Sequence, residues 1–123
     1  METGTQTITC WGDGTPTRSF TYIDDAAEAI VAALDKDVGG DPINICDETE
    51  IAIRDLVEQI ATLTGFTGDI YWDASKPNGQ RRRLFTNTRA KEQLGWQPLT
   101  AFDTGLQRTI DWYRETRETQ RSR

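Results

Sequence analysis

The 123-residue sequence contains no histidine, which removes the commonest general base and the commonest metal ligand from any chemistry of this chain. Catalysis by these residues alone would depend on carboxylates, lysine, tyrosine or cysteine. Only two cysteines are present, Cys10 and Cys46, and each lies in a short apolar segment. We interpret both as small buried side chains, because a zinc site requires a cluster of ligands and the sequence has none.

Long apolar runs are also missing from the sequence. No stretch is long enough to span a bilayer, and no charged start followed by an apolar core indicates a signal peptide. The formal net charge of -6 argues against nucleic acid as a partner, although Arg81 to Arg83 form a local basic cluster. We therefore expect a cytoplasmic location, with neither a membrane nor a nucleic acid as partner.

Length and composition predict one globular domain. Hydrophobic residues make up 36% of the chain and charged residues 28%, and the four tryptophans supply large apolar surfaces for a modest core. Residues 1–6 are small and polar, so we predict a disordered N-terminus. We assign the folded domain to residues 7–115 and a charged tail to residues 116–123.

Hydrophobic spacing predicts a small mixed α/β fold with short strands and about four helices. The predicted extended segments are 7–11, 20–23, 43–46 and 69–72. The predicted helices are one capped by Asp24 or Asp25 and ending near Asp35, one over 53–64, a brief one capped by Asn87, and one after the capping box Thr100-x-x-Asp103. Gly65 and Gly95 are the predicted terminators of the second and third helices.

Three of these helices carry apolar stripes, and the stripes of the first and the last predict a buried face. In the first helix the stripe consists of Ala26, Ala29, Ile30, Ala33 and Leu34. In the last helix it consists of Phe102, Leu106, Ile110 and Tyr113. The pattern of the 53–64 helix is the most regular of the chain, with apolar residues at i, i+3, i+4, i+7 and i+8.

Arg18 lies in a glycine-containing loop between two apolar segments. Its guanidinium presents a rigid fork of donors that suits a phosphate, and Trp11 nearby offers a flat apolar face. The alternative interpretation is a structural pair between Arg18 and a neighbouring carboxylate such as Asp24. Spacing alone leaves both interpretations open.

These residues resemble the carboxyl-terminal part of the extended short-chain dehydrogenase/reductases that act on nucleotide sugars, also called the NAD-dependent epimerase/dehydratase family. The pentapeptide Ser75-Lys-Pro-Asn-Gly79 is most similar to the GDP-L-fucose synthase subfamily. The stretches that carry the resemblance follow the family's order and are Trp11–Gly14, Arg18–Asp25, Ile43–Ile45, Ile53–Leu56, Ser75–Gly79, Arg82–Leu84, Leu94–Trp96, Gly105–Leu106 and Thr109–Tyr113.

In that family a Rossmann half binds NAD(P) and carries a Ser/Tyr/Lys catalytic set, while the smaller half holds the nucleotide sugar. The sequence contains no glycine-rich dinucleotide fingerprint after a strand and no Tyr-x-x-x-Lys motif. The resemblance therefore implies a substrate-binding lobe without its Rossmann half. It implies NAD(P) for the missing half only, and no catalytic, cofactor-binding or metal-binding residue in this chain.

The resemblance assigns roles to four residues of a nucleotide-sugar site. Arg18 and Arg83 match basic positions that contact the nucleotide diphosphate, and Arg82 is a neighbour that could share it. Trp11 matches an aromatic at the edge of the pocket. For Arg82 a solvated surface charge is the alternative, and for Trp11 a core or edge aromatic without a ligand.

The sequence departs from the family pattern at several positions. Cys46 stands where the family usually has a glycine and is followed by two acids, while Ala52 replaces the usual helix-capping hydroxyl residue. Thr86 stands in place of a common aspartate, and Arg81 in place of a common proline.

Two functions remain open. The first is a GDP-sugar-like nucleotide-sugar-binding domain of an NAD(P)-dependent epimerase or reductase, inactive alone. The second is a non-catalytic interaction or oligomerisation module derived from that domain. The expected partners are a nucleotide sugar, a separate Rossmann domain, or a second copy bound through the orphaned face.

Overall fold

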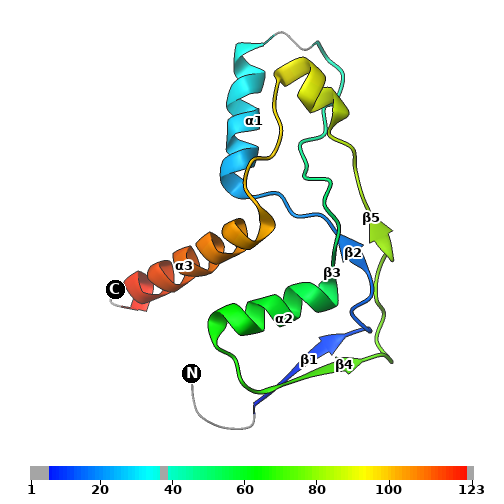
Figure 1. Cartoon of the computed structure of the whole chain (residues 1–123), viewed down its shortest axis with the longest axis vertical. Coiled ribbons are helices and arrows are strands. Elements are labelled where there is room, and N and C mark those ends of the chain that lie inside the picture. The colour runs from blue at the N-terminus through cyan, green and yellow to red at the C-terminus, as the bar shows by residue number, and fades with distance from the viewer. Residues whose placement is uncertain (1–5, 37–38, 122–123) are drawn as a thin grey trace. The chain divides into compact units, whose positions relative to one another are not determined.

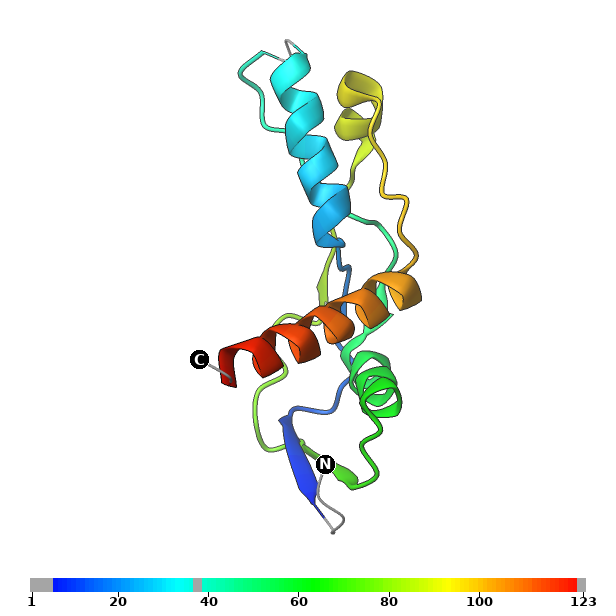
Figure 2. The same ribbon diagram turned by 90° about the vertical axis from the view of Figure 1, so that its left-hand side faces the viewer.

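The computed structural model describes residues 6–36 and 39–121, which fold into two compact units (Figures 1 and 2). Unit 1 comprises the described residues through Arg18 together with Ile51–Arg83. Unit 2 comprises Ser19–Glu50 and the described residues from Leu84 onward. The range 7–115, predicted as one domain, is thus divided between the two units. Most of the predicted disordered N-terminus, residues 1–5, lies outside the described residues.

Unit 1 contains two small sheets. Strand β1 (Thr7–Trp11) pairs in parallel with β4 (Asp69–Asp73), and the extended segments predicted over 7–11 and 69–72 correspond to them. In the second sheet β2 (Thr17–Arg18) lies between β3 (Ile51–Ala52) and β5 (Arg82–Arg83). The β2–β3 pair is antiparallel and the β2–β5 pair is parallel.

Helix α2 (Ile53–Thr64) has the predicted bounds and ends at Gly65, whose φ of 75° lies in the left-handed region that favours glycine. Ala52 occupies its N-cap and makes no side-chain cap. The first helical amides are instead satisfied by the loop before β2. Ile53 N–H donates to the Pro16 carbonyl and Arg54 N–H to the Gly14 carbonyl, each at 2.9 Å.

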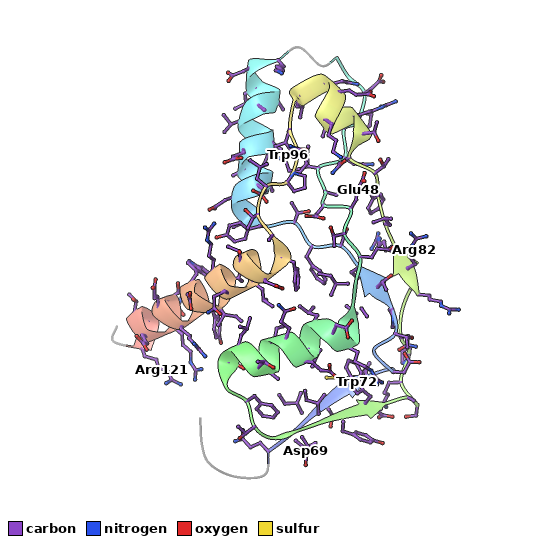
Figure 3. All side chains as sticks on the ribbon, in the orientation of Figure 1. Glu48, Asp69, Trp72, Arg82, Trp96 and Arg121 are labelled. Carbon is purple, nitrogen blue, oxygen red and sulfur yellow. The ribbon has the colours of Figure 1, made fainter. Side chains whose placement is uncertain are left out.

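Unit 2 is built from α1 (Ile23–Asp35), the π-helical η1 (Ala90–Leu94) and α3 (Phe102–Arg121). Its buried core cluster consists of Ala29, Ala90, Leu94 and Trp96, with Ala32, Ile43 and Ile45 packed against it. Trp96 lies beside α1 (Figure 3), where its indole N–H donates to the Asp25 carbonyl at 2.8 Å.

The predicted helix caps of unit 2 are wrong, and three of the predicted capping side chains, Asp25, Asn87 and Thr100, have tertiary partners instead. Neither Asp24 nor Asp25 caps α1, whose N-cap is Tyr22 without a side-chain bond. The buried Asp25 carboxylate accepts hydrogen bonds from the backbone N–H and the hydroxyl of Thr100, both at 3.0 Å. The Thr100 hydroxyl therefore binds Asp25 and does not form the predicted capping box. Asn87 does not cap η1 either: its Nδ2 donates to the Cys46 carbonyl at 2.9 Å, and its buried Oδ1, the atom that would accept a cap bond, has no hydrogen-bond partner within the described residues.

Two predicted extended segments of unit 2 are not assigned to a sheet. The segment 43–46 is irregular backbone, although Cys46 is buried as expected. The segment 20–23 is also unpaired, and its last residue begins α1. Both cysteines are free thiols, with Cys10 only half-buried.

The predicted burial of α1 is largely wrong. Ala29 is fully buried, but Ile30 and Leu34 are 63% and 82% exposed. In α3 the predicted stripe is buried at Ile110 and half-buried at Phe102 and Leu106, whereas Tyr113 is 57% exposed. The helix continues through Arg121, so the first part of the predicted tail is helical. Gly95, with a φ of 64°, terminates η1 as predicted.

No helix of the described ranges 6–36 and 39–121 is long and apolar enough to cross a membrane. The same ranges contain no group of three or more metal-ligating side chains.

Candidate functional site

Loop 12–16, which joins β1 to β2 in unit 1, depends on two glycines. Gly12 and Gly14 have φ angles of 88° and 78°, which other residues rarely adopt. A Cβ atom on Gly14 would lie 2.7 Å from Arg54 Cβ and 3.0 Å from the Trp72 ring. Close approach of the loop to α2 and β4 therefore requires glycine at this position.

Asp13 organises the same loop through its carboxylate. The Asp13 Oδ1 atom accepts hydrogen bonds from the backbone N–H of Thr15 at 3.0 Å and from its hydroxyl at 2.7 Å. These bonds, the hydroxyl first, hold the pKa of the Asp13 carboxyl below its usual value. The turn is therefore built around a carboxylate that is ionised at neutral pH.

A second loop, residues 74–81, joins β4 to β5 and lies against the first. Asp73 begins it by accepting a hydrogen bond from Ser75 N–H at 3.1 Å. Asn78 then bridges the loops, because its Oδ1 accepts the Asp13 N–H at 2.8 Å. Beyond this bridge Thr17 N–H donates to the Arg81 carbonyl at 3.0 Å. Two segments more than sixty positions apart in sequence are thus fixed side by side.

The pairing of β2 with β5 brings Arg18 and Arg83 together. They are register partners in the parallel ladder, and directly paired residues of neighbouring strands project from the same face of a sheet. Arg18 is half-buried, and its Nη1 donates to the Thr17 carbonyl at 2.7 Å. Within unit 1 this carbonyl is the hydrogen-bond partner of the described Arg18 side chain.

Arg82 has a different orientation. Its register partner is Thr17, and consecutive residues of a strand project to opposite faces. Figure 3 shows the Arg82 side chain extending away from β2. Arg82 therefore does not lie on the face that Arg18 shares with Arg83.

Trp11 ends β1 at the same pair of loops and is 65% exposed, so it is not a core aromatic. The Lys76 ammonium lies 5.5 Å from the centre of its ring, within the range of a cation–π contact. Sequence analysis did not single out Lys76 or Asn78 as site residues. The signal was available in Ser75-Lys-Pro-Asn-Gly79, which contributed only to the family resemblance.

Arg54 has an internal structural role in this region. Its Nη2 and Nε donate to the Asp13 carbonyl at 2.6 and 3.2 Å, and its guanidinium lies 5.5 Å from the centre of the Trp72 ring. It therefore anchors the glycine loop to α2. Figure 3 shows Trp72 between α2 and the β1–β4 sheet.

The two loops concentrate positive charge in an acidic chain. Residues 1–18 and 51–83, the sequence ranges of unit 1, contain six basic and six acidic residues, whereas residues 19–50 and 84–123, those of unit 2, contain eight basic and fourteen acidic residues. Five of the six basic residues of unit 1 lie at the ends of β2 and β5 or in the loop between β4 and β5, namely Arg18, Lys76, Arg81, Arg82 and Arg83. Paired guanidinium groups at such a site can bind an anion, with two parallel N–H···O bonds each.

Comparison with known proteins gives one family for nearly the whole chain. The model of the GDP-mannose 4,6 dehydratase family matches residues 1–109. The chain is 38% identical over 110 residues to GDP-L-fucose synthase 1 of Arabidopsis thaliana. The aligned region covers 89% of this chain and 34% of the relative.

Solved structures of similar proteins have the same fold. A GDP-L-fucose synthetase from Naegleria fowleri bound to NADP superimposes with a TM-score of 0.82 at 28% identity, over 92% of this chain and 36% of that one. A Thermotoga maritima UDP-glucose 4-epimerase with UDP-glucose superimposes with a TM-score of 0.78 at 28% identity, over 90% and 36% of the two chains. The chain thus spans about a third of the length of the relatives it matches.

Proposed function

Because the chain belongs to the GDP-mannose 4,6 dehydratase family of extended short-chain dehydrogenase/reductases, we propose that unit 1 binds the diphosphate of a nucleotide sugar. The ligand class that we assign is a GDP-sugar, in line with the names of the family model and of the Arabidopsis relative. A UDP-sugar is the competing ligand, since the Thermotoga neighbour holds UDP-glucose.

The observation that carries this proposal is the register of β2 and β5. Arg18 and Arg83 project from one face of adjacent strands, from segments far apart in sequence. Guanidinium groups that project from one face of adjacent strands can bind a single anion together. A diphosphate offers enough oxygen acceptors for both guanidinium groups.

The loops supply the remaining contacts of the proposed site. Lys76 provides a third cation, and its position over Trp11 leaves most of that indole open to a ligand. Trp11 is suited to stacking on the base or on the apolar face of a sugar ring. Arg82 contributes long-range attraction only, because it projects from the opposite face of β5.

The proposal assigns binding and no chemical step to this chain. Related structures contain NADP or NAD, and reduction or epimerisation of a sugar requires such a cofactor. The residues present do not fit a nicotinamide cofactor, since the sequence has neither the glycine-rich fingerprint nor Tyr-x-x-x-Lys. We therefore expect a mixture of this chain, a GDP-sugar and NADPH to show no turnover.

Isothermal titration calorimetry with GDP and with UDP tests the proposal. We expect GDP to bind, and Arg18→Ala to weaken binding about 10- to 100-fold, because one charge-assisted contact to phosphate is worth about 1.5–3 kcal/mol. Arg18→Lys should recover part of this loss, since lysine retains the charge but not the bidentate fork.

Arg117→Ala is the matched control, because this exposed arginine of α3 belongs to unit 2. Its affinity for GDP should equal that of the unaltered chain. Equal loss in Arg117→Ala and Arg18→Ala would reduce the interaction to general charge attraction. Absence of binding by GDP, UDP and their sugars at millimolar concentration would refute the proposal.

A further inference from the structure

Asn78 makes two hydrogen bonds of opposite polarity to Asp13, a residue of the other loop of unit 1. Its Oδ1 atom accepts the backbone N–H of Asp13 at 2.8 Å. Its side chain also forms a hydrogen bond with the Asp13 carboxylate, which the hydroxyl and amide of Thr15 bind as well. Because a carboxylate offers acceptors only, the Asn78 amide nitrogen is the donor in this second bond. One side-chain amide thus binds both the main chain and the side chain of Asp13.

Gly12 leaves the room that this contact needs. It is buried, and a Cβ atom placed on it would overlap Asn78 Oδ1 and lie 3.0 Å from Asn78 Cγ. Any other residue at position 12 would therefore displace the Asn78 side chain or move one loop away from the other. The backbone of loop 12–16 is thus shaped to receive the Asn78 amide.

Asn78 lies between the points where its own loop approaches two cations of the proposed site. Gly79, the next residue, lies beside Arg18, since a Cβ atom on Gly79 would be 3.9 Å from Arg18 Nη2. Two residues before Asn78, the Lys76 ammonium lies 5.5 Å from the centre of the Trp11 ring. The contact with Asp13 therefore holds the loop at a position next to both cations.

We propose that Asn78 is a positioning residue of the nucleotide site, which holds Lys76 and Arg18 in place for the diphosphate through its two bonds to Asp13. The inference rests on the proposed function and adds the residue that sets the geometry of its cations. The site requires the amide and not only the size of the side chain. An aspartate at position 78 has the same shape, but it cannot donate to the Asp13 carboxylate and would place a second negative charge against it.

Substitutions that keep the side-chain shape test the amide contact in the whole 123-residue chain. In Asn78→Asp the Kd for GDP, measured by calorimetry, should rise about tenfold, because repulsion from Asp13 opens the contact between the loops. The reciprocal double variant, Asp13→Asn with Asn78→Asp, restores one amide and one carboxylate to the pair. The amide oxygen at position 13 can still accept the bonds from Thr15. The Kd should therefore return to within about threefold of that of the unaltered chain.

Asp69→Asn with Asn78→Asp is the charge-matched control. It has the same net charge as the reciprocal variant, but Asp69 is exposed and lies at the start of β4, whereas loop 74–81 follows the end of that strand. If Asn78→Asp acted only by general repulsion of GDP, both double variants would recover equally. We expect the control to bind GDP about tenfold more weakly than the unaltered chain. Equal recovery in the two double variants, or no recovery in the reciprocal one, would overturn the inference.

The Lys76 Hε resonances report the same geometry without any nucleotide. The ring current of Trp11 should shift them upfield in the unaltered chain, because the ammonium lies over the indole. The upfield shift should be lost in Asn78→Asp, return in the reciprocal variant and stay lost in the charge-matched control, while circular dichroism shows that all variants are folded. If the unaltered chain does not bind GDP, the proposed function fails, and these shifts alone decide whether Asn78 positions Lys76. A Lys76 shift that is unchanged in Asn78→Asp would overturn the inference even where GDP binds.

Discussion

The two units of this chain differ in their charge and in the contacts that stabilise them. The sequence ranges of unit 1, residues 1–18 and 51–83, have equal numbers of acidic and basic residues, and the order of the unit comes from glycine turns and hydrogen bonds in and between two loops. Unit 2 carries the whole surplus of negative charge and packs a small apolar core around Trp96. The comparison teaches that net charge is a poor guide to ligand class when basic side chains converge locally.

The sharpest difference between the units is how each holds its backbone. Loop 12–16 of unit 1 depends on positive φ angles and close approach, whereas unit 2 depends on buried contacts such as that between Asp25 and Thr100. Substitutions that disrupt the glycine turns of unit 1 should leave the buried contacts of unit 2 unchanged, and substitutions in unit 2 should leave the turns of unit 1 unchanged. The predictions below use this difference, from the largest effect to the smallest.

Gly14→Ala should cause the largest loss of stability, about 3 kcal/mol in the free energy of unfolding. The left-handed conformation costs about 1–2 kcal/mol for alanine, and the new Cβ would overlap Arg54 and the Trp72 ring. Gly39→Ala is the matched control, with a φ of 74° and no atom within 4 Å of the added Cβ. It should cost about 1 kcal/mol. Urea denaturation followed by Trp fluorescence measures both, and equal losses would contradict the crowding of Gly14.

Asp25→Ala should destabilise unit 2 by about 2–3 kcal/mol. The substitution leaves the N–H and hydroxyl of Thr100 without their acceptor, and a buried unsatisfied donor costs about 1–3 kcal/mol. Asp24→Ala, at an exposed neighbouring position, should change stability by less than about 0.5 kcal/mol. Thermal unfolding measures both variants. Equal unfolding midpoints for Asp25→Ala and Asp24→Ala would show that the Asp25–Thr100 contact does not stabilise unit 2.

Arg83→Ala and Arg82→Ala should differ in their effect on nucleotide affinity. The first removes a guanidinium on the face of Arg18 and should raise the Kd for GDP about tenfold, which corresponds to about 1.4 kcal/mol. The second removes only a charge on the opposite face, and the Kd should rise less than about threefold at 0.15 M salt. Calorimetry that gives the reverse order would show that the β2–β5 register does not set the binding face.

The turn at Asp13 should depend on pH only in acid. Folding lowers the pKa of its carboxyl, so the ionised form favours the folded turn, and this contribution is complete above the ordinary carboxyl pKa of about 4. It is lost as the pH falls through the lowered value in the folded state. The Thr15 amide resonance should therefore be constant from pH 8 to pH 5 and shift below pH 4. In Asp13→Asn this shift should disappear, and a transition near pH 6 would contradict the assignment.

Much of unit 1 could be predicted from the sequence, because its elements carry local signals. Apolar spacing and a terminal glycine predicted α2 from Ile53 to Thr64, and short apolar segments predicted β1 and β4. The two-residue strands β2 and β5 could not be predicted, since their pairing depends on loops that meet through Asn78. The resemblance of Arg18 and Arg83 to family positions anticipated that they converge, but not that Arg82 faces away.

Unit 2 was harder to predict, because its local signals are redirected by tertiary contacts. The capping residues Asp25, Asn87 and Thr100 all satisfy distant groups instead of helix ends. Segment 43–46 has the alternation of a strand, yet the described residues provide no strand to pair with it. The exposure of Ile30 and Leu34 on α1 could not be predicted either. Apolar periodicity shows that a helix has an apolar face, but it does not show whether another element covers that face.

The central claim is that Arg18 and Arg83 bind one diphosphate together. NMR of the guanidinium Nε–Hε resonances during titration of the whole chain with GDP tests it most directly. The account predicts that the Arg18 and Arg83 resonances shift along one saturable curve, while those of Arg117 and Arg121 in α3 do not move. Saturable shifts confined to the α3 arginines, or shifts of Arg18 and Arg83 with different midpoints, would contradict it.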